Sequence, residues 1–256
     1  MRISRVAALS VVIAIAALGV GSMPVRAQSA VDAAQALASA LDGAGAGIST
    51  TDQIAALEAA AAQGDPMALW QLGLMYENGE GVAQDKAKAF GYFAQIADQN
   101  AEMPSHGIEA DIVAHSFVKM GEYYQEGIPE AGIPKDGSRA TSLISHAATV
   151  FGDADAQYKL GELYQSARWL SLAARKGHAA AQAKLGNMLF NGGGDLPANR
   201  VEGLMWLTVA DRRATGTPEA GWIADMLNSA MSVASPDERK DAVELADTLG
   251  TQFGGL

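Results

Sequence analysis

An internal repeat is the feature that most constrains this chain of 256 residues. Its clearest copy runs from Asp65 to Asp98 and begins with residues that share one helix face: Ala68, Leu72, Gly73 and Tyr76. Gly79 and Gly81 then allow the chain to turn, and Asp85 is placed to cap a second helix. That second helix is expected to bury Ala89, Tyr92, Phe93 and Ala97. One repeat is therefore predicted to be a helical hairpin.

Three further copies follow, marked by Met120-Gly121, Leu160-Gly161 and Leu185-Gly186. Glycine junctions precede three of the four units: Gln63-Gly64-Asp65, Phe151-Gly152-Asp153 and Lys176-Gly177-His178. Upstream, 54–62 is predicted to be the second helix of a degenerate unit. Downstream, 218–233 and 236–249 are predicted to be capping helices. The expected fold is an all-α solenoid over 51–213 with C-terminal capping helices and a tail over 214–256.

The repeat resembles the Sel1-like repeat, which is related to the tetratricopeptide repeat. The resemblance implies an alpha-solenoid whose surface binds other proteins. The marker glycines at 73, 121, 161 and 186 are 48, 40 and 25 residues apart, against roughly 36 in that family. The excess falls in two inserts, 100–109 and 128–137. The deficit removes the turn of the third unit, so Ala154 to Lys176, which has no Gly or Pro after Gly161, is predicted to be one long helix that interrupts the stack.

The inserts and the residues around them resemble one particular branch of the Sel1-like proteins. Residues 75–99, the insert that follows and the stretch Gly121 to Pro129 are similar to the ExoR-like, exopolysaccharide-regulator branch of Sel1-like proteins in alphaproteobacteria. The similarity covers roughly residues 54 to 250. It implies a periplasmic protein that holds down a membrane sensor histidine kinase by contacting its periplasmic domain. The short third unit departs from that pattern and puts the partner surface around 160–180 in doubt.

The N-terminus carries a predicted secretory signal peptide. Arg2 and Arg5 precede an apolar run from Val6 to Val20, and Val25 and Ala27 are small residues at the positions that a signal peptidase reads. The run is shorter than the roughly 20 residues of a bilayer-spanning helix, although an uncleaved anchor is the alternative. Cleavage after Ala27 is expected to leave a periplasmic protein that does not span a membrane, with a flexible or weakly helical segment over 28–50.

Charge and residue types argue against several classes of function. Residues 28–256 carry a net charge of −14 and no dense basic cluster, so nucleic acid is not an expected partner. There is no Cys and no nucleophile motif, and the Gly43 to Gly47 stretch lacks the Lys of a phosphate loop. The histidines have no metal-binding spacing: His106, His115, His146 and His178. We therefore expect no enzyme, no catalytic residue, no metal and no cofactor.

Two places are candidates for binding a protein partner. Equivalent positions of the four first helices hold Trp70, Val118, Tyr158 and Ala183, which should line up on the concave wall of a solenoid. The aromatic pair could anchor a partner; the alternative is that both rings pack between repeats. The second candidate is the insert, with its two Ile-Pro pairs: Ile128, Pro129, Ile133 and Pro134.

Two hypotheses about function remain open at the level of sequence. The first is a regulator that binds the periplasmic domain of a sensor histidine kinase. The second is a structural adaptor that organises enzymes of the cell envelope or cell wall.

Overall fold

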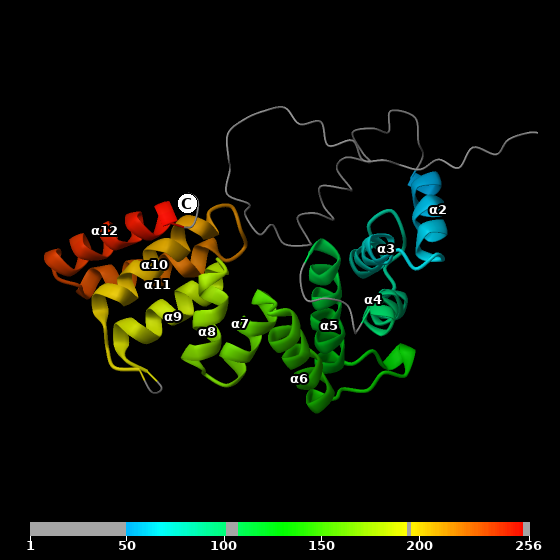
Figure 1. The fold of residues 1–256 in the computed structure, drawn as a ribbon, viewed down its shortest axis with the longest axis horizontal. Coiled ribbons are helices and arrows are strands. Elements are labelled where there is room, and N and C mark those ends of the chain that lie inside the picture. Colours follow the sequence, from blue (N-terminus) through cyan, green and yellow to red (C-terminus); the bar gives the residue numbers. More distant parts are fainter. Residues whose placement is uncertain (1–49, 101–106, 194–195, 253–256) are drawn as a thin grey trace, which may run out of the picture.

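The computed structural model describes residues 50–100, 107–193 and 196–252, and within them the chain is helical (Figure 1). The predicted signal peptide and the segment 28–49 lie outside the described residues, as does most of the insert 100–109. Short 3-10 and π turns occupy Pro129–Ala131 and Ala147–Phe151. The α-helices are α2 (Thr50–Ala61), α3 (Pro66–Asn78), α4 (Lys86–Asn100), α5 (Ile108–Glu126), α6 (Gly137–His146), α7 (Ala154–Leu163), α8 (Ala167–Arg175), α9 (Ala179–Asn191), α10 (Arg200–Ala214), α11 (Ala220–Val233) and α12 (Pro236–Gln252).

The helices pair as hairpins that follow one another along the molecule. α3 packs on α4, α5 on α6, α7 on α8 and α9 on α10, while α2 packs on α3 at one end. At the other end α11 and α12 pack on α10, and Figure 1 shows this progression from the cyan end to the red end. The predicted all-α solenoid with C-terminal capping helices is confirmed.

The junctions between units stop one helix and start the next as the sequence indicates. Gly64, Gly152 and Gly177 have positive φ of 84°, 68° and 90°, a conformation that side chains disfavour. The residue after each glycine caps the following helix by accepting a backbone N–H: Asp65 from Ala68, Asp153 from Ala156, and His178 from Ala181. This arrangement satisfies backbone donors that a helix start would otherwise leave unpaired.

The marker glycines let the two helices of each hairpin approach closely. A Cβ at Gly73 would lie 2.5 Å from the Phe93 ring, and one at Gly121 would lie 2.7 Å from Ile144. At Gly186 the nearest atom would be backbone, the Gly203 carbonyl oxygen at 2.8 Å. The repeat therefore requires glycine at this position because the second helix occupies the space of its side chain.

The prediction of one long helix over 154–176 is wrong. α7 ends at Leu163 and α8 begins at Ala167, so the third hairpin is short but complete. Gln165 adopts a left-handed φ of 49°, and the Ser166 side chain accepts the backbone N–H of Trp169. A Cβ on Gly161 would lie 2.7 Å from Leu170. Packing of Leu170 against Gly161 thus outweighs the local preference of these residues for continuous helix.

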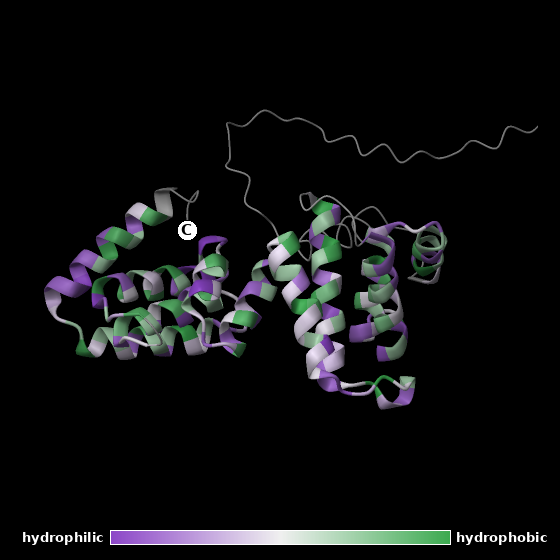
Figure 2. Ribbon diagram, turned by 60° about the horizontal axis from the view of Figure 1, so that its bottom comes forward, coloured by the Kyte–Doolittle hydropathy of each residue, from purple (hydrophilic) through white to green (hydrophobic). Residues whose placement is uncertain are grey.

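The buried core forms two clusters that meet at this short hairpin. The first runs from Ala61 to Leu160 and includes the buried residues of α7; the second begins with Leu170 on α8 and ends with Ala246 on α12. The helices carry alternating hydrophobic and hydrophilic stripes, as amphipathic helices in a two-layer stack do (Figure 2). The stack is not interrupted, since α8 packs directly on α9.

Candidate functional site

The first helices of successive hairpins share one face of the molecule, and a ladder of ion pairs connects them. Lys119 on α5 lies 2.9 Å from Glu77 on α3, and Lys159 on α7 lies 2.7 Å from Glu122 on α5. Lys184 on α9 continues the ladder to Glu162 on α7 at 3.0 Å. We call the face formed by α3, α5, α7, α9 and α11 the A-helix face.

A hollow of about 530 Å³ lies on the A-helix face, between α5, α7, α9 and α11. The Tyr158 ring stacks on the imidazole of His178 with centroids 4.5 Å apart. On the far wall, the Lys184 ammonium lies 5.7 Å from the centre of the Trp222 ring. We call this the inner hollow; carboxylates, lysines and rings line it together: Glu122, Asp155, Tyr158, Lys159, His178, Lys184, Glu219 and Trp222.

Histidines and aspartates tie three helices together beside the inner hollow. His178 accepts the Ala181 N–H at Nδ1, so its Nε2–H points to Asp155 Oδ1, 3.1 Å away. His115 Nε2 lies 3.7 Å from the other oxygen of Asp155, and His115 Nδ1 lies 3.5 Å from Asp153. Asp155 therefore bridges α5 and α9 from its place on α7.

The environment shifts the acidity of several of these groups. Burial raises the pKa of Asp153 despite the opposing charge of His115. Burial would also raise the pKa of Asp155, but the hydrogen bond and charge of His178, with His115, lower it below its usual value. Burial, and then the hydrogen bond to Glu162, raise the pKa of Tyr158, so its hydroxyl stays protonated. The lysines Lys119, Lys159 and Lys184 on this face are held in ion pairs with glutamates, which suits recognition of a complementary surface.

The four equivalent positions of the first helices, held by Trp70, Val118, Tyr158 and Ala183, do not form an exposed row. Trp70 is fully buried, with its ring 5.1 Å from Phe93 and 6.0 Å from His115, and Val118 and Ala183 are also in the core. Only Tyr158 is partly exposed and lines a hollow. The alternative, in which the tryptophan packs between repeats, therefore describes Trp70, because its position points into the hairpin contact.

The insert 128–137 is an ordered, closed loop. Ile128 and Ile133 exchange backbone hydrogen bonds of 2.8 and 3.1 Å, and Asp136 N–H donates to Tyr124 O. Ile128 is 1% exposed and belongs to the first core cluster, so its side chain anchors the loop. Pro129 and Pro134 are exposed and Ile133 is partly exposed, so these three remain candidates for contact with a partner.

Sequence reasoning missed most of the inner hollow. Trp222 lies on α11, a helix that we expected only to cap the stack. No motif in the sequence around Lys184 marks it as part of a site. His178 had a signal, because it follows the junction glycine Gly177 where the other units have Asp. Only the stacking of α7, α9 and α11 brings these residues together.

The described residues contain no group of three or more His, Cys, Asp or Glu side chains placed to hold a metal ion. None of the helices in the described ranges has the length and apolar character needed to cross a membrane.

Comparison with known proteins agrees with the repeat architecture. The Sel1 repeat family matches residues 66–100, 118–148, 154–167, 165–178 and 179–210. A solved structure of a Sel1 repeat protein from Oxalobacter formigenes superposes with a TM-score of 0.60 at 23% identity, covering 86% of this chain and 88% of that chain. This likeness supports the fold.

Two relatives cover most of the chain. It is 29% identical over 212 residues to the exopolysaccharide production negative regulator of Rhizobium meliloti (strain 1021). It is 30% identical over 211 residues to the protein of the same description from Rhizobium leguminosarum bv. viciae. Each match spans 78% of this chain and 76% of the relative. The chain therefore belongs to the Sel1-repeat proteins and, among them, to the ExoR family of exopolysaccharide production negative regulators.

Proposed function

We propose that this protein is a non-enzymatic, periplasmic regulator that binds the outer domain of a membrane sensor histidine kinase and thereby restrains exopolysaccharide synthesis. The observation that carries the proposal is the similarity over 78% of the chain to two negative regulators of exopolysaccharide production. Solenoids built from helical hairpins present extended binding surfaces, and the inner hollow is such a surface.

The chemistry of the inner hollow supports protein binding. Tyr158 and Trp222 offer ring surface beside charged groups that are already paired, including Lys159 with Glu122. Tyrosine and tryptophan often supply most of the binding energy in protein interfaces. Charges fixed by intramolecular pairs need little reordering when a partner docks, so the hollow is preorganised for binding.

Export to the periplasm is part of the proposal. Arg2, Arg5 and the apolar run 6–20 support a signal peptide that is cleaved after Ala27. N-terminal sequencing of the protein from its native host should then begin at Gln28. A full-length protein recovered from the inner membrane would contradict this part of the proposal.

Deletion of the gene tests the regulatory role. A negative regulator predicts more secreted exopolysaccharide and higher kinase output in the deletion strain, with both restored by the wild-type gene. Affinity purification with crosslinking from the complemented strain should recover the kinase. Unchanged exopolysaccharide, together with complexes that contain only cell-wall enzymes, would favour the structural adaptor instead.

A further inference from the structure

We propose that a groove between α8, α9 and α10 is a second docking site, which takes an acidic, amphipathic peptide segment of a partner protein. The groove has a volume of about 350 Å³. It shares no lining residue with the inner hollow. The two surfaces can therefore be tested independently.

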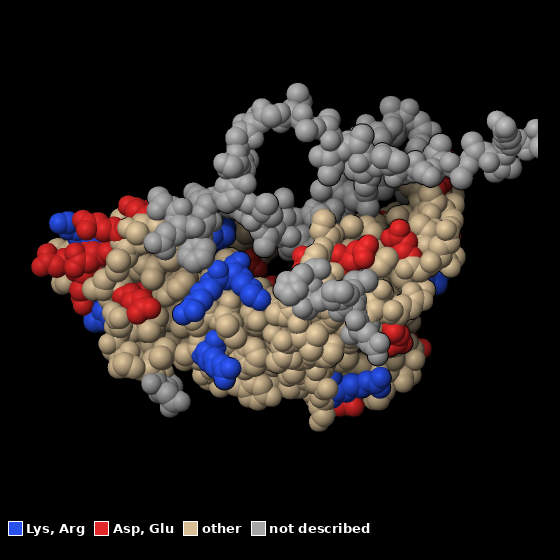
Figure 3. All heavy atoms as spheres, viewed as in Figure 1, with Lys and Arg blue, Asp and Glu red and all other residues tan. Residues whose placement is uncertain are grey.

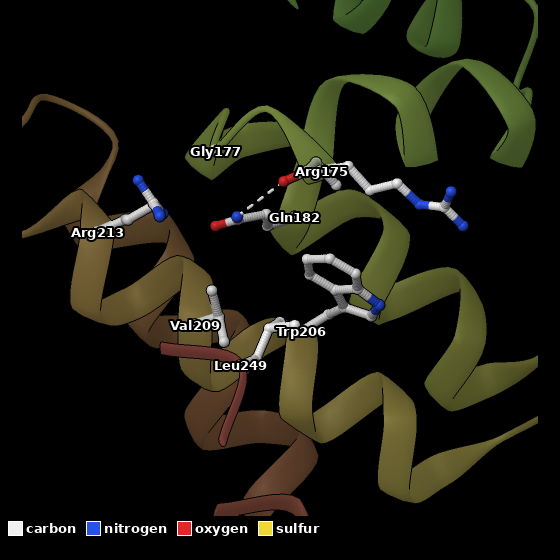
Figure 4. Close-up of a pocket in the computed structure, with 8 residues that line it drawn as sticks. Arg175, Gly177, Gln182, Trp206, Val209, Arg213 and Leu249 are labelled. Carbon is white, nitrogen blue, oxygen red and sulfur yellow. Dashed lines mark hydrogen bonds between the residues drawn. The ribbon is translucent and has the colours of Figure 1, made fainter. Parts of the chain in front are cut away.

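The floor of the groove is apolar. Leu185 and Leu189 of α9 and Leu196 of the following loop line it, together with Trp206 of α10. Figure 4 shows the Arg175 side chain extending past the indole of Trp206 and away from Arg213. A groove lined by apolar side chains can accept the apolar face of a helix.

Two arginines on the rim have no partner in the described part of the chain. Arg168 and Arg175 are seven residues apart on α8 and exposed, and Leu172, 37% exposed, lies on the same face between them. Neither arginine takes part in an ion pair or a side-chain hydrogen bond with any described residue. Arg200 and Arg212 on α10, by contrast, form ion pairs with Glu238 and Asp247.

Charge complementarity identifies the occupant. The whole chain has a net charge of −11, yet Figure 3 shows basic side chains gathered over α8, with the acidic ones on that face toward either end. The lining holds two guanidinium groups and one carboxylate, Glu202, which accepts a hydrogen bond from Asn199 at the start of α10. The net charge of the lining is therefore positive, and guanidinium groups bind carboxylates in bidentate geometry.

The spacing of the arginines sets the shape of the segment. Seven residues of helix separate them by about 10.5 Å, the distance between two carboxylates spaced i and i+7 on a facing helix. An anionic polysaccharide fits less well, because Trp206 is only 8% exposed and offers no open ring face for a sugar, whereas the exposed apolar side chain between the arginines is the aliphatic Leu172. The observations favour a peptide with acids on one side and apolar residues on the other.

Photo-crosslinking from within the groove identifies the occupant. The full-length gene, with p-benzoylphenylalanine replacing Ser171 on the groove wall, is expressed in the native host and irradiated, and the crosslinked peptide is sequenced by mass spectrometry. We expect a peptide of another protein with net negative charge and apolar residues at helical spacing. A crosslink to polysaccharide, to a second copy of this chain or to an uncharged peptide overturns the proposal, as does the absence of any crosslink.

Charge reversal provides the matched control. Arg168→Glu/Arg175→Glu should abolish the crosslink, whereas Lys86→Glu/Arg139→Glu, with the same change in net charge on exposed positions of α4 and α6, should retain it. The control pair makes surface contacts with Glu126 and the Tyr124 ring, so thermal unfolding is used to check that both variants are folded. A labelled synthetic peptide of the crosslinked sequence should bind the groove variant at least tenfold more weakly and the control variant within twofold. Equal binding to both variants overturns the proposal. Tyr158→Ala should leave this crosslink unchanged, which separates failure here from failure of the inner hollow.

Discussion

Tyr158 stacks on His178 across the boundary between α7 and α9, with ring centroids 4.5 Å apart and planes inclined by 26°. The contact joins the third hairpin to the fourth and leaves one side of the tyrosine facing the inner hollow. Trp70, at the equivalent position of the first hairpin, is fully buried. The same position of the repeat is therefore buried in the core in the first hairpin and faces a surface hollow in the third.

Replacing Trp70 by Ala should destabilise the fold without a specific effect on partner binding. The ring is 0% exposed, and removing a buried large aromatic side chain costs about 3–5 kcal/mol. Trp70→Phe should cost less, because the indole N–H has no hydrogen-bond partner among the described residues and the ring contact with Phe93 is kept. Urea unfolding measures both variants. A Trp70→Ala protein of wild-type stability would show that the ring is not packed in the core.

Gly161→Ala should destabilise the protein because the added methyl group would lie 2.7 Å from Leu170 Cδ2 and 3.1 Å from the Leu170 backbone nitrogen. Overpacking of this kind costs about 1–3 kcal/mol. Gly91→Ala is the matched control, since a Cβ there meets nothing within 4 Å and alanine favours helix by about 1 kcal/mol. Thermal unfolding should show opposite shifts for the two variants. Shifts of the same sign would contradict the close approach of α7 and α8.

Gln165→Gly should stabilise the third hairpin slightly. Gln165 has a φ of 49°, and the left-handed conformation costs a non-glycine residue roughly 1–2 kcal/mol, part of which is offset by the greater freedom of glycine in the unfolded chain. Gln165→Pro is the opposite test, because proline fixes φ near −65° and should be strongly destabilising. If position 165 were inside a continuous helix, glycine would destabilise it.

The stabilisation from Asp155 should disappear in acid. His178 and His115 hold the pKa of its carboxyl below the usual value of 3.8, against the effect of burial. Folding favours the ionised carboxylate. Its contribution to the free energy of unfolding is therefore complete at pH values above 3.8 and is lost as the pH falls through the lower pKa of the folded state. Because the side chain is 48% exposed, Asp155→Asn should cost only about 1 kcal/mol at neutral pH. The free energies of unfolding in urea of the wild-type and Asp155→Asn proteins should become equal at a pH below the folded pKa of Asp155. A difference that persists at that pH would contradict ionisation of Asp155 as the source of the stabilisation.

The sequence predicts the features that the repeats share, namely the hairpins and their helix caps. It does not predict the features that occur in a single unit. Gly73, Asp85 and the junction glycines are fixed by local backbone and packing requirements, so their pattern predicted the hairpins and caps. The turn at Gln165 escaped prediction because no Gly or Pro marks it and the contact between Gly161 and Leu170 decides it. Trp222 escaped because its approach to the inner hollow depends on how α11 returns to α9.

Direct binding to the kinase tests the central claim. The purified mature protein, residues 28–256, is titrated with the periplasmic domain of the sensor kinase from the same organism, alongside Tyr158→Ala and Tyr158→Phe. We predict saturable binding, weakened at least tenfold by Tyr158→Ala, which removes the ring, and little changed by Tyr158→Phe, which keeps the stack on His178. Absence of binding by the folded wild-type protein, or equal affinity for the wild-type and Tyr158→Ala proteins, would contradict the inner hollow as the regulatory surface.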